Sequence, residues 1–462
     1  MTEMAKIKVG LLLLYLKLYD DTMPGLRNEF EPFIKDIKIK LEQNGFEMYL
    51  SPICRLDEEF KKAIKDFEKS GVNVIVTLHL AYSPSLECIK ALTETRLPVV
   101  VLDTTLKYHF SSKLISNDIM FNHGIHGVQD MCNVLLRNRK NFLIAAGHIE
   151  EPDLIKRLVK KINSGMVYSS LVTSRVGNLG GPFYGMGDFF VPENTLMKDL
   201  GIKTVRSDFI NVAHMMPDKN STLLKDEIKS DFDYFDIKDL DPDVHLNSVR
   251  IGFGIKRWIE ENNLDAFTIN FTKLSSESGF PTIPFLEASK AMARGIGYAG
   301  EGDTMTAGVT GSLMKVYPET SFTEMFCPDW KENLILLSHM GEFNINLVSG
   351  KPKLIRKDLP FIQVGNPAVA IGQFKEGEAV LVNFSPSLNG YTLILSRIEL
   401  IDLKHDLEDS ITGWIKPRMP VSDFLAEYSR SGGSHHSAIV YGNVYDELMD
   451  FGRIMGCKIA EI

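Results

Sequence analysis

The first third of the chain alternates short apolar runs with amphipathic stretches, and no other feature constrains the fold as strongly. Apolar runs of strand length lie at residues 9–14, 47–50, 72–78, 99–102 and 142–146. Between them, apolar residues recur at helical spacing over residues 27–43, 57–70, 84–94 and 122–137. A regular strand–helix alternation predicts a parallel sheet with helices on both faces. We therefore expect a Rossmann-like α/β domain over residues 1–165.

A second α/β domain is expected next, and a change to short, alternating segments marks a third domain. Strands near residues 203–205 and 266–271 flank a helix at 245–261, which predicts another Rossmann-like domain over residues 166–318. From residue 319 the segments become short and alternating, at 334–337, 345–348, 368–374, 379–383 and 391–401. Glycine, proline and asparagine separate these segments. We expect an antiparallel, barrel-like β domain over residues 319–462, closed by a helix at 444–455.

Length and composition exclude several classes of protein. With 462 residues, 44% of them apolar, the chain can bury several cores. A net charge of -9 without a basic block argues against nucleic-acid and membrane-surface partners. Five cysteines without a CxxC pair favour a reducing, cytoplasmic location. The apolar run at residues 9–16 is too short to cross a bilayer, so we interpret it as a buried strand.

Two further segments could suggest ligand sites, but neither has the required pattern. The glycines of residues 177–182 match neither a dinucleotide fingerprint nor a P-loop, and Pro182 lacks the N–H that a phosphate cradle would use. The acidic run at residues 226–243 lacks the glycine and terminal glutamate of a calcium loop. We interpret this run as a solvated connection.

Carboxylates and imidazoles placed at segment ends form the candidate site. Its members are Glu301, Glu324, His339 and the adjacent pair His435 and His436. Glu301 lies in residues 297–303, which we interpret as a tight glycine-rich turn entering a helix. Two carboxylate oxygens with two imidazole nitrogens suit manganese, cobalt, iron or zinc rather than calcium. Open positions on such an ion would accept adjacent hydroxyl and carbonyl oxygens of a polyol, the geometry needed to move a carbonyl along a sugar.

Each of these residues also has a plainer interpretation. Glu301 can be part of an ordinary capped loop, and Glu324 continues an apolar–polar alternation typical of a surface strand. His339 lies beside an apolar run and can be a satisfied core histidine. Their joint placement at segment ends favours a shared site.

Motifs along nearly the whole chain are similar to one known family. In the second half they are residues 254–257, 266–268 with Phe271, 297–303 with 306–307, 321–324, 338–340 and 432–436. Residues 78–79, 83–84 and 122–127 add to the match in the first half. With these motifs the chain resembles the L-arabinose isomerase group of the L-arabinose/L-fucose isomerase superfamily.

The resemblance implies roles for individual residues. Glu301, Glu324, His339 and His436 match the family's manganese ligands, with cobalt as a possible substitute, and the two glutamates match its acid/base pair. The reaction implied is an aldose–ketose isomerisation through a cis-enediol, with a hydride shift as the competing path. Because strand neighbours point to opposite faces, only one of His435 and His436 should reach the metal.

The same resemblance implies how the substrate is enclosed. The family forms trimers or hexamers in which a neighbour's N-terminal domain closes the active site. His126 would then contact the substrate from the neighbouring subunit, and Phe271 matches an aromatic residue that lines the sugar site.

Several departures from the family bear on the substrate. Thr304 and Met305 replace a tryptophan and a lysine, and the run at residues 325–330 differs. Leu16 stands where the family has a substrate-binding glutamine, and Lys17 follows it. We expect a sugar other than L-arabinose. Lys17 would suit an anionic sugar such as sulfoquinovose, or it is a solvated lysine. Two other classes remain open, a non-catalytic sugar-binding protein and a metal-dependent aldolase or hydrolase.

Overall fold

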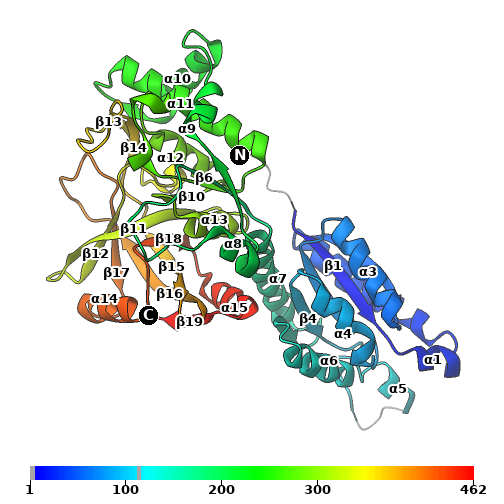
Figure 1. Ribbon diagram of the computed structural model, residues 1–462. Coiled ribbons are helices and arrows are strands. Elements are labelled where there is room, and N and C mark those ends of the chain that lie inside the picture. The colour runs from blue at the N-terminus through cyan, green and yellow to red at the C-terminus, as the bar shows by residue number, and fades with distance from the viewer. Residues whose placement is uncertain (1–5, 112–115) are drawn as a thin grey trace. The chain divides into compact units, whose positions relative to one another are not determined.

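The computed structural model describes residues 6–111 and 116–462, and the chain divides into two compact units. The first unit runs to residue 170 and includes residues 447–456, while the second contains residues 171–446 and 457–462 (Figure 1). Within the described ranges, no helix has the length and apolarity needed to cross a membrane.

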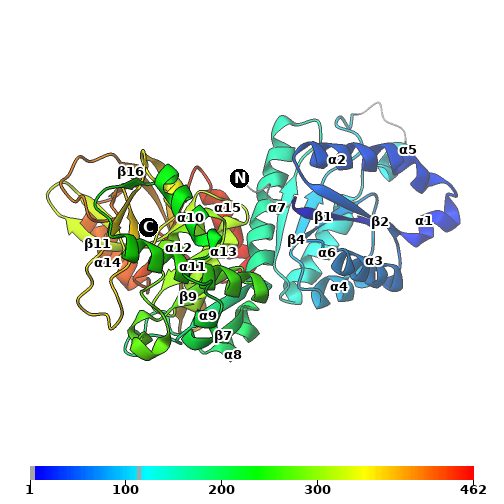
Figure 2. The same cartoon turned by 90° about the horizontal axis from the view of Figure 1, so that it is seen from above.

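The first unit is built on a five-stranded parallel sheet. Its strands are β1 (Lys8–Leu14), β2 (Glu47–Cys54), β3 (Val74–His79), β4 (Val99–Asp103) and β5 (Phe142–Ala146), in the order β2-β1-β3-β4-β5. The helices α2 (Glu31–Gln43) and α7 (Pro152–Val172) cover one face, and α3 (Asp57–Lys69), α4 (Ser85–Glu94) and α6 (Ile125–Arg137) cover the other (Figure 2). Alternate residues of β1 enter the two cores, Leu13 with α2 and α7 and Leu14 with α3, because strand side chains alternate between faces.

Shorter helical segments and part of the last helix complete this unit. The short segments are α1 (Lys17–Thr22), η1 (Leu26–Phe30) and α5 (Ser116–Met120). Residues 447–456, mostly from α15 (Tyr445–Met455), return to this unit. Asp450 pairs with Lys161 on α7, and Ile454 joins the core beneath that helix.

The second unit begins with a four-stranded parallel sheet in the order β10-β9-β6-β7. Its strands are β6 (Arg175–Leu179), β7 (Lys203–Ser207), β9 (Ala266–Ile269) and β10 (Gly297–Gly300). The associated helices are α9 (Phe209–His214), α10 (Thr222–Tyr234), α11 (Pro242–Asn262), α12 (Phe285–Ala293) and α13 (Thr304–Met314). Short turns are α8 (Glu193–Thr195), η2 (Leu196–Leu200), η3 (Phe271–Lys273) and η4 (Ser276–Ser278).

The strands that follow close into an antiparallel barrel. Its six strands, in spatial order, are β15 (Gly377–Ser387), β18 (His436–Tyr441), β11 (Thr320–Asp329), β12 (Leu334–Ser338), β17 (Gly413–Pro417) and β16 (Gly390–Ile401). The ring closes because β15 pairs with β16 as well as with β18. The strand β19 (Lys458–Glu461) adds to β16, α14 (Val421–Arg430) lies between β17 and β18 in the chain, and β13 (Lys353–Arg356) joins β14 (Ala368–Ile371) to β8 (Asp236–Ile237).

The predicted fold class is confirmed: two parallel sheets with helices precede an antiparallel barrel. The boundary expected at residue 318 lies between α13 and β11, inside the second compact unit, so the division into three domains stays a prediction.

Three local predictions were wrong. Residues 297–300, predicted as part of the glycine-rich turn, form β10, and only residues 301–303 turn the chain into α13. The segment at 345–348 is a 3-10 turn, η5 (Ile345–Leu347), capped by the side chain of Asn344. The acidic run at residues 226–243 was predicted to be a solvated connection, but residues 226–234 belong to α10. Within this helix Asp231 is buried and pairs with His245 and Lys290.

Candidate active site

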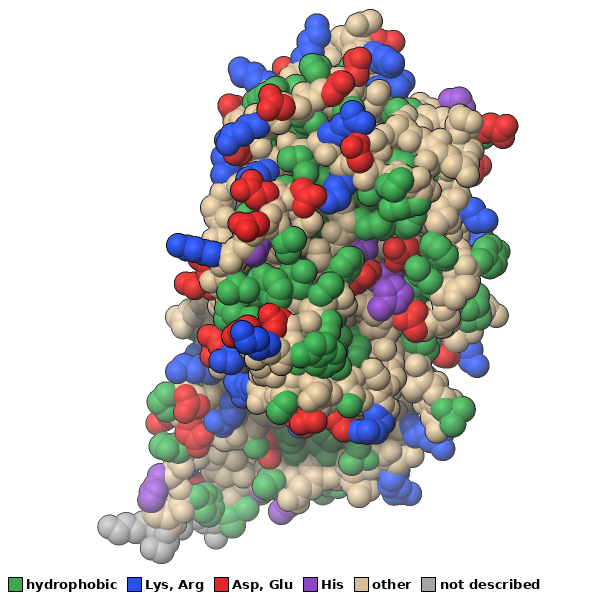
Figure 3. Space-filling model, turned by 90° about the vertical axis from the view of Figure 1, so that its left-hand side faces the viewer, with side chains coloured by type: hydrophobic (Ala, Val, Ile, Leu, Met, Phe, Trp, Pro, Cys, Tyr) green, Lys and Arg blue, Asp and Glu red, His purple; other side chains and the backbone are tan. Residues whose placement is uncertain are grey.

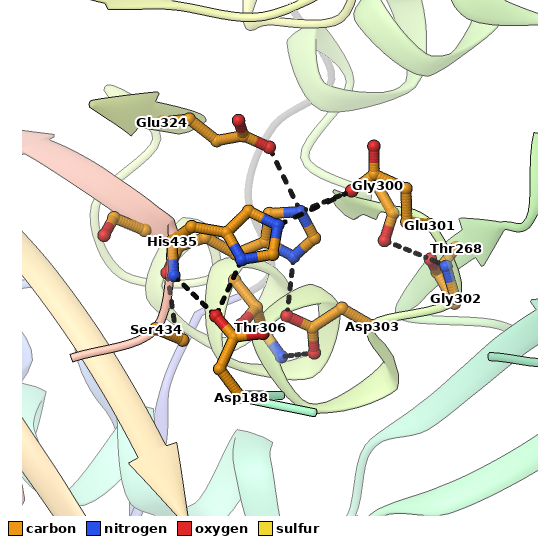
Figure 4. A network of polar contacts seen from close by, with 12 residues as sticks. Asp188, Thr268, Gly300, Glu301, Gly302, Asp303, Thr306, Glu324, Ser434 and His435 are labelled. Carbon is orange, nitrogen blue, oxygen red and sulfur yellow. Dashed lines mark hydrogen bonds and ion pairs between the residues drawn. The ribbon is translucent and has the colours of Figure 1, made fainter. Parts of the chain in front are cut away.

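Glu301 follows directly from β10 at the carboxyl edge of the central sheet. It has a φ of 57° and Gly302 a φ of 87°, so two left-handed residues in succession turn the chain into α13. A side chain on Gly302 would overlap the carbonyl oxygen of Gly181, so only glycine fits this position. The Thr268 hydroxyl fixes the turn by donating to Gly300 O (3.1 Å) and accepting from Gly302 N–H (2.9 Å) (Figure 4).

Three neighbouring barrel strands supply the other members of the site. Glu324 lies on β11, His339 follows the end of β12, and His436 begins β18. In the strand register Glu324 faces Ser338 on one side and His436 on the other. Cross-strand neighbours lie about 5 Å apart, so this register brings the three side chains to one end of the barrel.

The four side chains converge on one point. One ligand atom from each of Glu301, Glu324, His339 and His436 lies within 4.8 Å of the others. The Nε2 atom of His436 is 2.7 Å from Glu301 Oε2 and 3.1 Å from Glu324 Oε1, which is also 3.1 Å from His339 Nε2. Glu301, His339 and His436 are buried. Buried carboxylates this close need cationic partners, and this mixed oxygen and nitrogen donor set suits a divalent transition metal.

Both imidazoles are oriented by carboxylates behind them. His436 Nδ1 lies 2.9 Å from Asp303 Oδ2, and His339 Nδ1 lies 2.6 Å from Glu342 Oε2. The hydroxyl of Tyr298 donates to the other oxygen of Glu342 at 2.9 Å. Such contacts hold Nδ1 as the donor and leave Nε2 free to coordinate an ion. All three supporting residues are buried.

The carboxylates and imidazoles of the cluster shift one another's pKa values. Burial raises the pKa of Glu324, but hydrogen bonds from His339 and His436 outweigh it and lower the pKa to about 2. Burial raises the pKa of Glu301, but the nearby imidazole of His435 and the hydrogen bond from His436 outweigh it and lower the pKa. Burial lowers the pKa of His339, but the charge of Glu342 and the bond to Glu324 raise it to about 10. These shifts favour carboxylates that face protonated imidazoles.

His435 and His436 are adjacent but differ in position. His436 is fully buried in the cluster, whereas His435 is 39% exposed and its Nε2 is 3.9 Å from Glu301 Oε2. Asp188 holds His435 through both the backbone N–H (2.9 Å) and Nδ1 (2.7 Å). Figure 3 shows histidine side chains near the middle of one face, with acidic side chains beside them and hydrophobic side chains around.

The remaining predicted site residues lie elsewhere. Phe271 begins η3 after β9, and its ring is 6.3 Å from that of Phe183 and 5.7 Å from that of Phe361. His126 is an exposed residue of the first turn of α6 in the first unit. Lys17 begins α1 in the same unit, and its Nζ lies 3.0 and 2.9 Å from the carboxylate oxygens of Asp21. The structure relates neither of these two residues to the cluster.

Sequence reasoning missed the supporting residues. Asp303 is the N-cap of α13, since it accepts from Thr306 N–H at 2.9 Å, and no sequence pattern marks it as a partner of His436. Glu342 stands three residues after His339, and this spacing was an available signal. Asp188 and Tyr298 carry no such signal, because the fold alone brings them to the histidines and to Glu342.

Comparison with known proteins agrees with this architecture. A family model for the L-arabinose isomerase central domain matches residues 205–319, and one for the L-arabinose isomerase C-terminal domain matches residues 319–458. Together they span more than half of the chain.

Curated relatives match over almost the full length. An L-arabinose isomerase of Anoxybacillus flavithermus is 25% identical, covering 90% of this chain and 86% of its own. One of Shouchella clausii is 25% identical (92% and 88%), and L-arabinose isomerase 1 of Clostridium acetobutylicum is 23% identical (92% and 90%). A solved arabinose-binding transporter component aligns with a TM-score of 0.17 and 11% identity, which supports no inference.

The fold and these matches define a sugar isomerase. The chain belongs to the L-arabinose isomerase family, as a divergent member.

Proposed function

We propose that this chain is a metal-dependent aldose–ketose isomerase that acts on an open-chain sugar. The observation that carries the proposal is the convergence of Glu301, Glu324, His339 and His436, with both histidines backed by carboxylates. A sugar-binding protein would have no use for such a set. Mn²⁺, or Co²⁺ in its place, fits the donor atoms, and when bound it supplies a Lewis acid that polarises the sugar carbonyl.

The two glutamates supply the proton transfers in this proposal. One carboxylate removes the proton from C2 of the aldose, and the C2–H electron pair forms the C1–C2 double bond of the cis-enediol in its enediolate form. The other carboxylate carries the O2 hydroxyl proton to O1, and as the C2 carbonyl forms the first glutamate returns its proton to C1, so both glutamates end as carboxylates. Phe322 packs against both imidazoles, with ring centroids 4.9 and 5.1 Å away, and shields this region from water.

For the substrate, we propose an aldose other than L-arabinose. Leu16 provides no hydrogen bond where the family has a glutamine. Lys17 is already paired with Asp21, so no observation favours an anionic sugar such as sulfoquinovose as a second candidate. Phe271, with Phe183 and Phe361 around it, is proposed as an apolar wall for the sugar chain.

For the assembly, we propose a trimer or hexamer in which His126 reaches a neighbour's site. Exposed apolar side chains on α6 and on the neighbouring helices α1 and α5 support this: Leu18 is 56% exposed, Ile119 51% and Ile125 43%. His123 links these segments, because its Nε2 is 2.8 Å from Tyr19 OH and its Nδ1 is 2.8 Å from Ile119 O. Exposed apolar patches of this kind mark interaction surfaces.

A substrate panel tests the function. L-arabinose, L-fucose, D-galactose and sulfoquinovose are incubated with the purified protein and Mn²⁺, and ketose formation is measured. We expect a ketose product, with L-arabinose among the poor substrates. Efficient conversion of L-arabinose contradicts the proposed preference, and cleavage products in place of a ketose contradict the reaction.

A further inference from the structure

The loop between β6 and α8 contacts both members of the His435–His436 pair. Two consecutive residues of this loop, Asp188 and Phe189, make the contacts. Neither is part of the four-residue cluster. Asp188 bonds to His435, whereas Phe189 packs against both rings, 4.9 Å from that of His436 and 5.6 Å from that of His435.

Phe189 holds the ring of His436. The two rings stack with centroids 4.9 Å apart and planes within 14°, and Phe189 is only 2% exposed. Phe322 meets the same imidazole in a T-shaped contact at 5.1 Å, and Asp303 holds its Nδ1. Rotation of the His436 ring would break all three contacts, so Phe189 restricts the direction in which Nε2 points.

Asp188 holds His435 instead. Its Oδ2 accepts from the backbone N–H and from Nδ1 of His435, which fixes both the residue and its ring. The rings of His435 and His436 are 4.2 Å apart, and His435 Nε2 is already 3.9 Å from Glu301 Oε2. A small rotation of a free His435 would thus bring a second imidazole of this pair to the ligand position.

We propose that Asp188 and Phe189 are positioning residues that give the adjacent histidines separate roles. Phe189 keeps His436 in the orientation of a metal ligand, and Asp188 keeps His435 beside Glu301 and outside the ligand set. This inference rests on the metal site of the proposed function and concerns how the chain selects one histidine of two.

Phe189 borders a cavity, so a smaller side chain at this position would lose its contact with His436. Phe189 and Phe190 both line a cavity of about 290 Å³ whose other walls include Met305 and Leu196. Because space already exists beside Phe189, truncating it leaves the His436 ring unsupported. Phe190 is the next residue, is 52% exposed, and serves as a matched control.

The first test measures Mn²⁺ affinity by calorimetry. Phe189→Ala and Phe189→Leu should weaken binding about tenfold or more, as is usual for loss of a group supporting a metal ligand. Phe189→Tyr, which keeps the stacked ring, and Phe190→Ala should bind as the parent protein does. Equal affinity in Phe189→Ala, Phe189→Leu and Phe190→Ala would overturn the role of Phe189, and Phe189→Leu decides the matter if the alanine variant does not fold.

The second test follows the ligand set by the visible absorption spectrum of bound Co²⁺. In Asp188→Ala the released His435 should change the spectrum, and the double variant Asp188→Ala/His435→Ala should restore it. An unchanged spectrum in Asp188→Ala would overturn the role of Asp188. A parent protein that binds neither Mn²⁺ nor Co²⁺ refutes the metal site itself, whereas a parent that binds both, with all variants alike, refutes only this inference.

Discussion

At the scale of single residues, the cluster places two negatively charged glutamates against two histidines in the protein interior. Glu301 and Glu324 are stabilised as anions by neighbouring imidazoles, of which those of His339 and His436 lie 2.7 to 3.1 Å away. When no metal ion is bound, protonated imidazoles supply the positive charge that balances the two carboxylates. A metal must displace those protons, so binding and protonation compete for the same nitrogen atoms.

This competition gives a pH prediction with a definite sign. The pKa of His339 is raised to about 10 and that of His436 is also raised, so both imidazoles are protonated in the metal-free protein at neutral pH. Mn²⁺ binding should release about two protons, and affinity should rise with pH between about pH 6 and pH 9. Calorimetry in two buffers with different ionisation enthalpies measures the release. Affinity that is constant or falls with pH would contradict this account.

The candidate ligands were within reach of sequence analysis, but most of the residues that support them were not. Glu301, Glu324 and His339 stand at segment ends in short motifs, and pleat geometry limited the choice between His435 and His436. Glu342 lies three residues from His339, a spacing that the sequence shows, whereas Asp303 and Asp188 reach His436 and His435 from more than one hundred residues away. No periodicity encodes such contacts.

At the scale of elements, the stretch 297–303 shows how glycine can mislead. Its glycines suggested a turn, yet Gly297–Gly300 is a strand. A side chain on Gly297 would overlap the backbone of Gly311 in α13, so these glycines serve close packing of a helix on a strand. Only Gly302 is required by the turn itself, since it has both a positive φ and no room for Cβ.

A pair of glycine substitutions separates these two requirements. Gly350 also has a positive φ of 79°, but nothing lies within 4 Å of its Cβ position. Gly350→Ala should lower the free energy of unfolding by about 1 kcal/mol from backbone strain alone. Gly302→Ala should cost roughly twice that or more and weaken Mn²⁺ binding about tenfold, because Glu301 must move. Chemical denaturation and calorimetry measure both, and equal behaviour of the two variants would refute the role of the turn.

At the scale of the whole molecule, alternation of apolar runs predicted the parallel sheets and the barrel, because each face of a strand must enter a core. It could not predict that residues 447–456 belong to the first unit. That placement depends on burial of Ile454 and on pairing of Asp450 with Lys161, which lies 289 residues away in the sequence.

Assembly is tested at this scale by complementation. If His126 acts on a neighbour's cluster, then His126→Ala and Glu301→Gln each damage a different half of a shared site. Co-expressed, the two variants should recover activity that neither shows alone, since some interfaces join an intact His126 to an intact Glu301. Light scattering should show a trimer or hexamer. No recovery, or a fully active monomer, would refute a site shared between subunits.

The central claim is that one ion held by Glu301, Glu324, His339 and His436 enables sugar isomerisation, and its most direct test is ketose formation with the metal removed and restored. The best aldose of the substrate panel is used with the parent protein and with Glu301→Gln, His436→Ala and His435→Ala. We predict that chelation abolishes ketose formation, that Mn²⁺ restores it in the parent, and that Glu301→Gln and His436→Ala stay inactive while His435→Ala keeps partial activity. Undiminished ketose formation after chelation, or full turnover by Glu301→Gln or His436→Ala, would contradict the account.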